Sequence, residues 1–373
     1  MSSVDELRKK YDTSDMFSLI INMPKDLRRY LDEFDGELPE ELSTVKGKAR
    51  LSDIDKVVFL GMGGSAIGGD IVFSYLYEKL RKPVSIVRDF KIPGFVDSNT
   101  LVIGVSYSGN TDETIAATLE CIKKGAYVVL LTSNGVLETM GEKFNIPIYR
   151  LPRDRPPRTA IASMLAALLR VSEKTELADV NFAEIYQAAD FLESIMERYK
   201  NLDEDDLPYK LASDIVGSIP LIYSYKPYSP IGFRFKTQLN ENAKIHAFYA
   251  EIPEANHNEI MGWEGPLKEY YFPVFLRGKS EPEEIKVRVD FWGELLKEFE
   301  VDYLEIKSSG PNLFGELLYL LATVDMTSYI LALLRKVDPY PVGIIHKLKE
   351  FTETKLSFKK KITKEINSRK IAF

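Results

Sequence analysis

Short, continuously apolar runs alternate with helical patterns along this chain, and this alternation is its strongest constraint on fold. In the first half the runs are rich in valine, isoleucine and leucine, at residues 57–60, 84–88, 101–105, 127–132 and 146–150. Apolar residues at helical spacing lie between or after them, at 65–80, 111–123 and 159–171. A strand has a continuous apolar run when helices cover both faces of its sheet. The pattern therefore predicts a parallel α/β sheet.

The alternation restarts after a helical pattern at 182–200 and an acidic stretch at 203–206, which we expect to be an exposed linker. We expect the later strands at 219–225, 244–250, 271–276 and 303–306. We expect the later helices at 231–242, 283–299 and 312–334. The whole pattern predicts two α/β units, each a mostly parallel sheet flanked by helices on both faces.

The chain has 373 residues, a length typical of two or three domains. We place a first domain at 1–155, with a leading helix at 16–32 that Pro24 interrupts. Connecting helices and the acidic linker follow at 156–206, then a second domain at 207–350 and a basic tail at 351–373. A run of like charges is typical of a solvated helix face. We therefore assign the tail no role beyond solubility or contacts in a dimer.

Composition limits the compartment and the partners. Lysine and arginine total 49 against 56 acidic residues, so the net charge of −7 lacks the basic footprint of a nucleic-acid-binding protein. The most apolar stretch, 312–334, contains Glu316 and Asp325, which are costly inside a bilayer, so we expect a buried helix and no membrane partner. The single cysteine, Cys121, excludes an intrachain disulfide and is expected to be a buried structural thiol. We expect a cytoplasmic protein.

A glycine-rich loop, Gly61-Met-Gly-Gly-Ser-Ala-Ile-Gly-Gly-Asp70, separates the first apolar strand from its helix. Glycines allow close backbone approach, and a helix start presents N–H groups to an anion. The same loop also fits a dinucleotide fingerprint with Gly61, Gly63 and Ala66, and Asp89 could then hold ribose hydroxyls. An NAD-dependent oxidoreductase is therefore one open reading.

A second loop places three hydroxyls before a helix: Ser106, Ser108 and Thr111. Each hydroxyl alone could be a helix N-cap. Together with Ser65 on the neighbouring glycine loop, they could form a pocket for one phosphate monoester. A dinucleotide site would not need this cluster.

Gly-Gly-Ser followed by Ser-x-Ser-Gly-Asn-Thr resembles the sugar isomerase (SIS) domains, which bind phosphosugars. The version here resembles the bifunctional phosphoglucose/phosphomannose isomerases of archaea and bacteria, over most of the chain, from Tyr11 to Lys349. The resemblance implies two SIS-type subdomains. It also implies that the phosphate is bound by the glycine loop and the hydroxyl cluster, at Gly63, Gly64, Ser65, Ser106, Ser108 and Thr111.

Aldose–ketose isomerisation needs a carboxylate base, a proton shuttle at the ring oxygen and a cation for the developing enediolate. The resemblance implies that Glu241 is the base, that His257 assists ring opening and that Arg158 stabilises the enediolate. It further implies that His257 reaches the site of a neighbouring subunit, which would make the protein a homodimer. It assigns a second ring-opening group to a C-terminal lysine after Asp338-Pro-Tyr-Pro-Val342, which is Lys349 by register, with Lys347 the near alternative.

Without the resemblance, the same residues could have ordinary structural or surface roles. Most of the 56 acids are expected to be solvated surface groups, and Arg158 has Arg153 and Arg155 as neighbours that could equally be surface charges. Among the three histidines we expect His246 in a core strand and His346 in solvent, so only His257 lies in a polar loop, where Asn256 and Asn258 could fix its tautomer.

The resulting hypothesis is a cytoplasmic enzyme of carbohydrate metabolism that converts glucose 6-phosphate and mannose 6-phosphate reversibly to fructose 6-phosphate through a cis-enediol. An enediol route needs no redox cofactor, and the sequence has no paired His/Cys spacing or Asp-rich loop for a metal. The alternative is a phosphosugar sensor that binds the same ligands without turnover.

Overall fold

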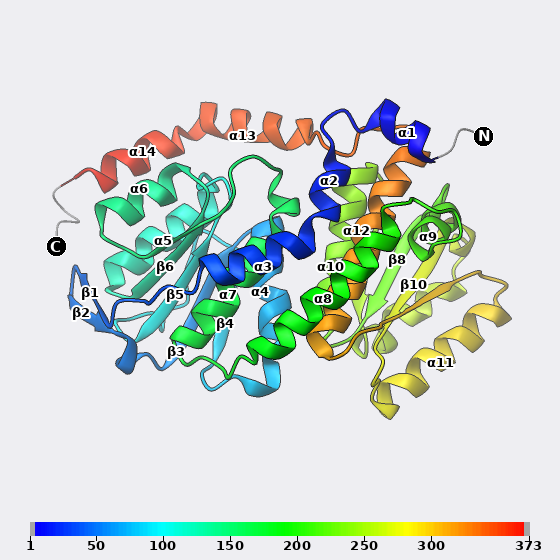
Figure 1. The fold of residues 1–373 in the computed structure, drawn as a ribbon, viewed down its shortest axis with the longest axis horizontal. Helices are drawn as coiled ribbons and strands as arrows, with labels where there is room; N and C mark the ends of the chain where they lie inside the picture. Colours follow the sequence, from blue (N-terminus) through cyan, green and yellow to red (C-terminus); the bar gives the residue numbers. More distant parts are fainter. Residues whose placement is uncertain (1–3, 369–373) are drawn as a thin grey trace. The chain divides into compact units, whose positions relative to one another are not determined.

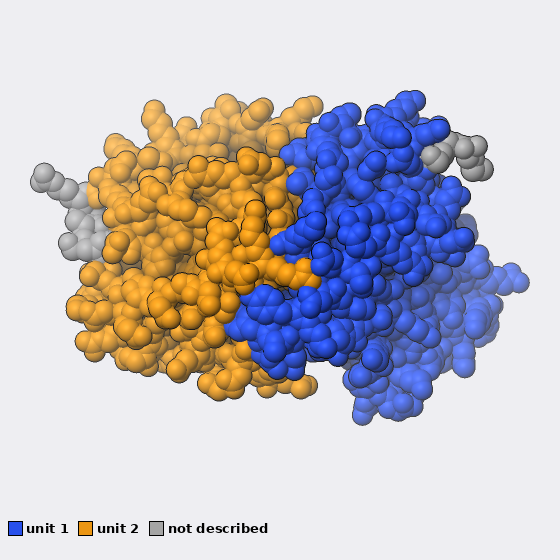
Figure 2. Space-filling view, viewed as in Figure 1, with its two compact units in different colours: residues 1–25, 181–341 blue, residues 26–180, 342–373 orange. Residues whose placement is uncertain are grey.

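The computed structural model describes residues 4–368, which divide into two compact units (Figure 2). Of the described residues, unit 1 contains 4–25 and 181–341, and unit 2 contains 26–180 and 342–368. The family resemblance, the strand pattern and the sheets agree on the class: both units are α/β, with all-parallel main sheets. The predicted domain boundaries at 155, 206 and 350 stay a prediction.

Unit 2 contains a five-stranded sheet of order β4-β3-β5-β6-β7. Its strands are β3 (Lys56–Gly61), β4 (Val84–Val87), β5 (Thr100–Val105), β6 (Tyr127–Thr132) and β7 (Ile148–Arg150). Its helices include α3 (Met23–Glu33), α4 (Gly63–Tyr75), α5 (Asp112–Lys124), α6 (Gly135–Lys143) and α7 (Ile161–Lys174) (Figure 1). Every residue of β5 and β6 is buried, which explains their unbroken apolar sequences.

The order of these strands creates a switch point. The chain leaves β3 through α4 toward β4, and it leaves β5 through α5 in the opposite direction, toward β6. Right-handed crossovers then put α4 and α5 on opposite faces of the sheet. In such sheets ligands bind outside the carboxyl ends of the strands where the order reverses. The two predicted phosphate loops follow β3 and β5.

Several elements of unit 2 were not predicted. A hairpin of β1 (Glu41–Thr44) and β2 (Gly47–Arg50) precedes the sheet, and α6 fills the interval before β7. The resemblance does imply a C-terminal helix around Lys347 and Lys349, which is α13 (Gly343–Leu356), but α14 (Phe358–Ile366) after it was not predicted. Short 3-10 turns lie at Leu51–Asp53, Tyr77–Lys79 and Pro157–Thr159.

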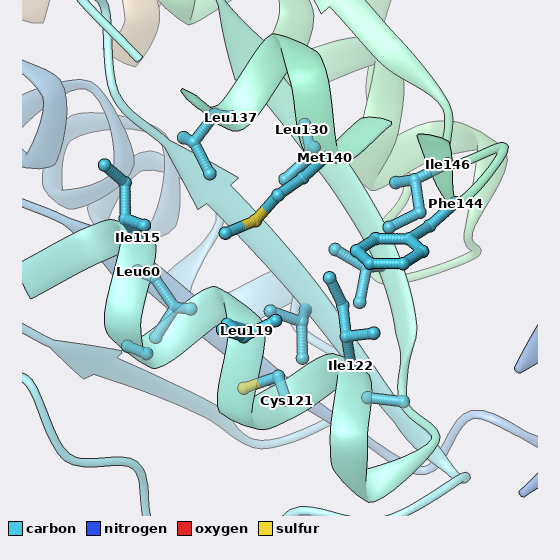
Figure 3. Close-up of a cluster of buried hydrophobic side chains, with 14 of the residues drawn as sticks. Leu60, Ile115, Leu119, Cys121, Ile122, Leu130, Leu137, Met140, Phe144 and Ile146 are labelled. Carbon is cyan, nitrogen blue, oxygen red and sulfur yellow. The ribbon is translucent and has the colours of Figure 1, made fainter. Parts of the chain in front are cut away.

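The basic tail is not simply a solvated charge run. Lys360, Lys361 and Lys364 are exposed as expected, but the other face of α14 buries Ile362 and Ile366. This face contacts α5 and α6 and extends the apolar cluster shown in Figure 3. Cys121 lies fully buried in the same cluster, which confirms the structural thiol. The rest of the tail, 369–373, is outside the described residues.

Unit 1 contains a four-stranded sheet of order β11-β10-β8-β9. Its strands are β8 (Ile219–Ser224), β9 (Phe248–Glu251), β10 (Tyr271–Arg277) and β11 (Leu304–Lys307). Its helices are α1 (Val4–Tyr11), α2 (Met16–Ile21), α8 (Phe182–Tyr199), α9 (Leu207–Ile215), α10 (Ser229–Gln238), α11 (Glu283–Glu298) and α12 (Leu313–Leu334) (Figure 1). A π-helical turn (Leu239–Ala243) continues α10, and 3-10 turns cover Glu254–His257, Glu259–Glu264 and Lys268–Tyr270.

Helix α12 is the core of unit 1. It is long and apolar enough to cross a membrane, yet 89% of its apolar window is buried inside the protein, as expected for a core helix. It packs on α8, α9 and α10, and the leading helices α1 and α2 also contact it. The break expected at Pro24 is present, because α2 ends at Ile21 and Pro24 lies in the first turn of α3, where proline is tolerated.

Three expectations for unit 1 need correction. The strand expected at 244–250 begins only at Phe248, because the π turn runs to Ala243 and Lys244 has a left-handed backbone (φ 57°). His246 is therefore exposed and outside the strand rather than in the core. The acidic linker is also not wholly exposed, since Asp206 is buried beside α9 and forms an ion pair with Arg198.

Candidate active site

The glycine loop of unit 2 has the backbone that an anion site needs. Helix α4 begins at Gly63, whose φ of +52° lies in the left-handed region that favours glycine. A Cβ on Gly64 would lie 3.5 Å from the backbone nitrogen of Arg158, so this loop packs against the Pro157–Arg158 segment. The first N–H groups of a helix have no partner within the helix and can bind an anion.

Hydrogen bonds join the glycine loop to the hydroxyl loop. The Tyr107 N–H donates to Ser65 Oγ at 3.1 Å, and the Ser106 and Thr111 hydroxyls are 2.8 Å apart. Ser65 and Ser106 are buried. Thr111 stands at the N-cap of α5, but its side chain makes no capping bond and pairs with Ser106 instead. The structure thus brings Ser65, Ser106 and Thr111 together at two helix starts.

Contacts with Ser133 and Asn134, and a bond within the loop, hold the hydroxyl loop in its conformation. Gly109 has φ +61°, and a Cβ there would lie 1.6 Å from the carbonyl oxygen of Asn134, so only glycine fits. Ser133 Oγ donates to the Tyr107 carbonyl at 2.6 Å. Ser108 Oγ accepts from the Asn110 N–H at 3.3 Å, which turns the loop back on itself. Ser108 is half-buried.

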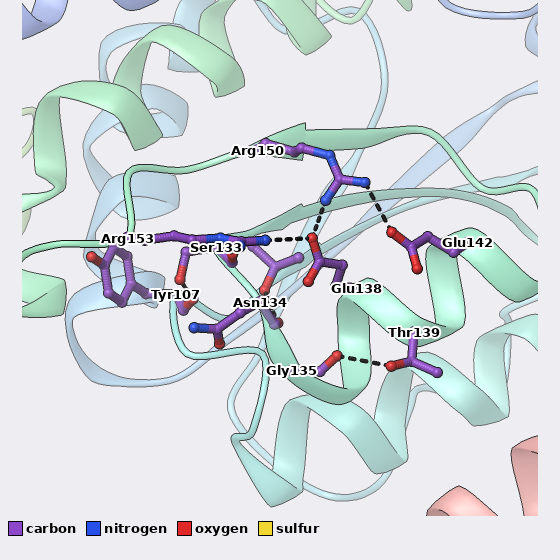
Figure 4. A network of polar contacts seen from close by, with 10 residues as sticks. Tyr107, Ser133, Asn134, Gly135, Glu138, Thr139, Glu142, Arg150 and Arg153 are labelled. Carbon is purple, nitrogen blue, oxygen red and sulfur yellow. Dashed lines mark hydrogen bonds and ion pairs between the residues drawn. The ribbon is translucent and has the colours of Figure 1, made fainter.

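The three candidate arginines differ in their surroundings. Arg153 donates to the Ser133 carbonyl (2.8 Å) and forms an ion pair with Glu138 (2.9 Å) that Arg150 shares (Figure 4). Arg155 forms an ion pair with Asp26. Arg158 is only 2% exposed and adjoins Gly64. Of the three, Arg158 is the one whose backbone adjoins the glycine loop, and its role stays a prediction.

Lys349 lies on α13 and is exposed. Burial raises the pKa of Asp112, at the first position of α5, while the charges of Lys359 and Lys349 oppose that rise. Glu353, one turn after Lys349, also acts on Asp112. The charges of Lys349 and Glu353, one turn apart on α13, thus reach the start of α5, next to Thr111. The choice of Lys349 over Lys347 stays a prediction.

Glu241 lies in unit 1, half-buried in the π-helical turn that follows α10. Such turns occur often at functional sites. A buried polar network joins α10 and this turn to α12. Arg234 binds both carboxylate oxygens of Asp325 (2.8 and 2.6 Å), and Gln238 binds the same carboxylate (3.0 Å). Asn242, the neighbour of Glu241, donates to Ser328 Oγ at 2.9 Å.

This network was not predicted. Asp325 was noted only as a charge that a bilayer would reject. A carboxylate in an otherwise apolar helix must be paired when buried, and Arg234 and Gln238 are four residues apart on a predicted helix. That spacing was the available signal.

His257 is exposed at the end of a 3-10 turn, and His346 is exposed on α13, as expected for the latter. The flanking asparagines bond elsewhere. Asn258 donates to Glu254 and accepts from the Glu259 N–H (3.0 and 2.6 Å). Asn256, with its amide placed to satisfy both atoms, bonds the Pro253 carbonyl and Trp292 (each 3.2 Å). Neither asparagine fixes the imidazole tautomer in this arrangement.

The predicted site residues thus divide between the units: the phosphate loops, Arg158 and Lys349 in unit 2, Glu241 and His257 in unit 1. Asp89, the acid of the dinucleotide reading, is exposed and accepts from the Lys91 N–H in its own loop (3.2 Å). Within residues 4–368, no group of three or more His, Cys, Asp or Glu side chains is arranged to hold a metal ion.

Comparison with known proteins gives two domain matches, and the second runs past the end of unit 1 at 341 into α13. Residues 50–146 match the SIS domain, and residues 204–351 match the bacterial phospho-glucose isomerase C-terminal SIS domain. A bifunctional phosphoglucose/phosphomannose isomerase of Thermoplasma volcanium is 38% identical over 329 residues, covering 84% of this chain and 99% of that protein. The chain belongs to the bifunctional phosphoglucose/phosphomannose isomerase family. It is therefore an enzyme of the isomerase class.

Two further relatives mark the breadth of the likeness. A D-glucosamine-6-phosphate 4-epimerase of Sulfolobus acidocaldarius is 30% identical, covering 81% of this chain and 90% of that protein. The crystal structure of a hypothetical protein from Thermus thermophilus matches with a TM-score of 0.70 at 17% identity, covering 95% of this chain and 94% of that one. The latter likeness concerns the fold alone.

Proposed function

We propose that this isomerase interconverts glucose 6-phosphate and mannose 6-phosphate with fructose 6-phosphate through a cis-enediol. The supporting observation is that the Ser106–Thr111 hydroxyl pair and Ser65, which bonds the backbone of the hydroxyl loop, lie at the starts of α5 and α4. Hydroxyls and helix N–H groups suit the doubly charged, compact phosphate of a monoester. Gly63, Gly64 and Ser108 complete this phosphate site in the proposal.

The chemistry begins with ring opening. His257 and Lys349 move a proton from the anomeric hydroxyl to the ring oxygen, so the bond from C1 to the ring oxygen breaks and an open-chain aldehyde remains. Glu241 then removes the proton from C2, and the electron pair forms the C1–C2 double bond with negative charge on O1. The permanently charged guanidinium of Arg158 stabilises that charge. The O2 hydroxyl proton then passes to O1, and Glu241 returns the proton to C1, so a hydroxyl forms at C1 and a carbonyl at C2, which gives the ketose.

The same intermediate explains two aldose substrates. An enediol has no stereocentre at C2, so glucose 6-phosphate and mannose 6-phosphate give one common species. In the proposal the enzyme needs neither metal nor redox cofactor, acts in the cytoplasm in glycolysis or gluconeogenesis, and is a homodimer in which His257 reaches the partner's site.

Incubation of EDTA-treated protein with fructose 6-phosphate in D2O, followed by proton NMR, tests this. We expect both aldose phosphates to form, with deuterium at C2. Conversion without deuterium would contradict the proton-transfer route, and activity lost with EDTA and restored by zinc would contradict metal independence. Binding without turnover would favour the sensor.

A parallel incubation with D-glucosamine 6-phosphate gives the matched control for the epimerase relative. We expect no change at C4. Turnover of that amino sugar, with fructose 6-phosphate left untouched, would overturn the proposed substrates and leave the phosphate site intact.

A further inference from the structure

Helix α13 is held in place by something other than its own packing. It is described along its whole length and has no buried residue. Even its apolar side chains are open to solvent, with Ile344 84% and Phe351 61% exposed. Helices in proteins gain most of their stability from an apolar face packed on a core. The position of α13, and therefore of Lys349, must be set at its ends.

Helix α14 supplies a firm attachment at the C-terminal end of α13. Ile366 is 0% and Ile362 9% exposed, and both join the cluster that α5 and α6 form with the sheet (Figure 3). Phe358 packs against this cluster, with its ring edge-on to Phe90 at 6.1 Å. An ion pair from Lys123 to Glu365 (2.7 Å) flanks the apolar contact.

The corner between the two helices is closed by hydrogen bonds. Ser357 has a left-handed backbone (φ 48°), and its N–H donates to the Glu353 carbonyl at 2.8 Å. The Lys359 N–H donates to the Glu353 carboxylate at 3.2 Å. These bonds fix the direction in which α13 leaves α14, so docking of α14 also orients α13.

We propose that α14 is an anchor that positions Lys349 beside the hydroxyl loop, with Ile362 and Ile366 as positioning residues. The proposal rests on the role of Lys349 in the proposed function. The attachment runs along α5: Glu365 pairs with Lys123 near its C-terminal end, and the charge of Lys359 acts on Asp112 at its start, next to Thr111. Helix α14, which begins at Phe358, lies outside the residues that match the family domain, 204–351.

A double-mutant cycle with a matched control tests the anchor. Ile362→Ala weakens the docking of α14, whereas Ile146→Ala removes the same side chain, also 9% exposed, from the same cluster but from the segment before β7. We expect Ile362→Ala to lower kcat about tenfold and Ile146→Ala to leave it within about twofold. Lys349→Met should lower kcat about 100-fold, in the range of a lost proton-transfer group.

The double mutant, with both Lys349→Met and Ile362→Ala, gives the decisive result. In the Lys349→Met background, Ile362→Ala should lower kcat no further, since the side chain that it positions is already gone. Ile362→Leu should restore activity. Additive losses in the cycle, or equal losses in Ile362→Ala and Ile146→Ala, would overturn the anchor.

Hydrogen exchange separates this failure from a failure of the proposed function. Ile362→Ala should speed amide exchange throughout α13 and α14 while the sheet stays protected, and unchanged exchange there would also overturn the anchor. If Lys349→Met alone keeps full turnover while the exchange changes as expected, it is the catalytic assignment of Lys349 that fails, and the positioning proposal falls with it.

Discussion

The switch points of the two sheets have similar topology but opposite polar content. In unit 1, as in unit 2, the chain leaves two adjacent strands in opposite directions, β8 toward β9 and β10 toward β11. Beyond these strand ends lies the buried carboxylate of Glu316. It accepts hydrogen bonds from Tyr228 Oη (2.8 Å), the Lys279 N–H (2.9 Å) and the Ser308 hydroxyl.

In unit 2 the corresponding place is lined by hydroxyls and helix starts: Ser106 bonds Thr111, and Ser65 accepts from the Tyr107 N–H. Unit 1 therefore satisfies its strand-end donors with an anion of its own, while unit 2 offers its donors to an anion from outside. Two sheets of the same kind thus support different tasks. The phosphate is expected on unit 2 alone, and the acid–base work on Glu241 of unit 1.

The largest expected effect separates these tasks. Glu241→Gln should lower kcat about 1,000-fold, because the amide cannot accept the carbon-bound proton. Binding of fructose 6-phosphate, measured by calorimetry, should change less than about twofold and saturate at one ligand per chain. Glu298→Gln, an exposed acid on α11, is the control. A loss of affinity equal to the loss of turnover would break the comparison.

A change in the phosphate site of unit 2 should have the opposite effect, weakening binding while turnover is retained. Ser106→Ala should raise KM about tenfold with kcat nearly kept, since a hydrogen bond to a charged group contributes about 1.5–3 kcal/mol. Ser172→Ala is a matched control, because Ser172 is equally buried, at 0% exposed, on α7 of the same unit. If steady-state kinetics show kcat falling while KM stays constant, Ser106 does not hold the phosphate.

A smaller effect is expected from the network behind Glu241. Ser328→Ala removes the hydrogen-bond acceptor of the Asn242 amide, and Asn242 is 0% exposed, so its amide would be left unpaired. The π turn should then shift, and kcat should fall about fivefold at constant KM. Thr327→Val is the control, since the Thr327 hydroxyl bonds only within its own helix, to the Thr323 carbonyl (2.7 Å). Equal losses of kcat in both variants would assign the effect to α12 as a whole.

The last prediction concerns the stability of unit 2 rather than its kinetics. Burial raises the pKa of the Cys121 thiol to about 12 from an ordinary value of 9.0. The unfolded thiol loses its proton first as pH rises, so this contribution to stability is full below pH 9 and declines by about 1.4 kcal/mol per pH unit toward pH 12. The free energy of unfolding, measured with urea, should depend on pH differently in the native protein and in Cys121→Ala only between about pH 9 and pH 12.

The same thiol distinguishes the units. A thiol reagent at pH 8 should label Cys121 only when unit 2 opens, because this residue is the one cysteine of the sequence. Rapid labelling of the folded enzyme would contradict the buried cluster.

Much of the fold could be predicted where burial is complete. The apolar run at 127–132 matches β6 in both bounds, and α12 was recognised despite its two acids. Exposed or short elements left weaker signals: β1 and β2 each bury only one of four residues. The apolar spacing of 244–250 suggested a strand, but the left-handed Lys244 delays it, which is a tertiary effect that no alternation of residues reveals.

For the site, hydroxyl spacing and glycine content indicated the phosphate loops from physical chemistry alone. The roles of Glu241, His257, Arg158 and Lys349 depended on the family resemblance, because one acid among many has no distinguishing pattern. The buried position of Arg158 and the docking of α14 could not be foreseen, since both depend on which distant segments meet.

The path of the chain between the two units has consequences for folding during translation and for proteolysis. It passes from one unit to the other three times, at 25/26, 180/181 and 341/342. The sheet of unit 2 leaves the ribosome before unit 1 has been made, but α13 and α14 follow only after the sheet of unit 1, so the phosphate-binding half acquires its lysine after that sheet. A single protease nick at 180/181 would also leave each fragment with segments of both units, and the two halves would co-purify as one particle.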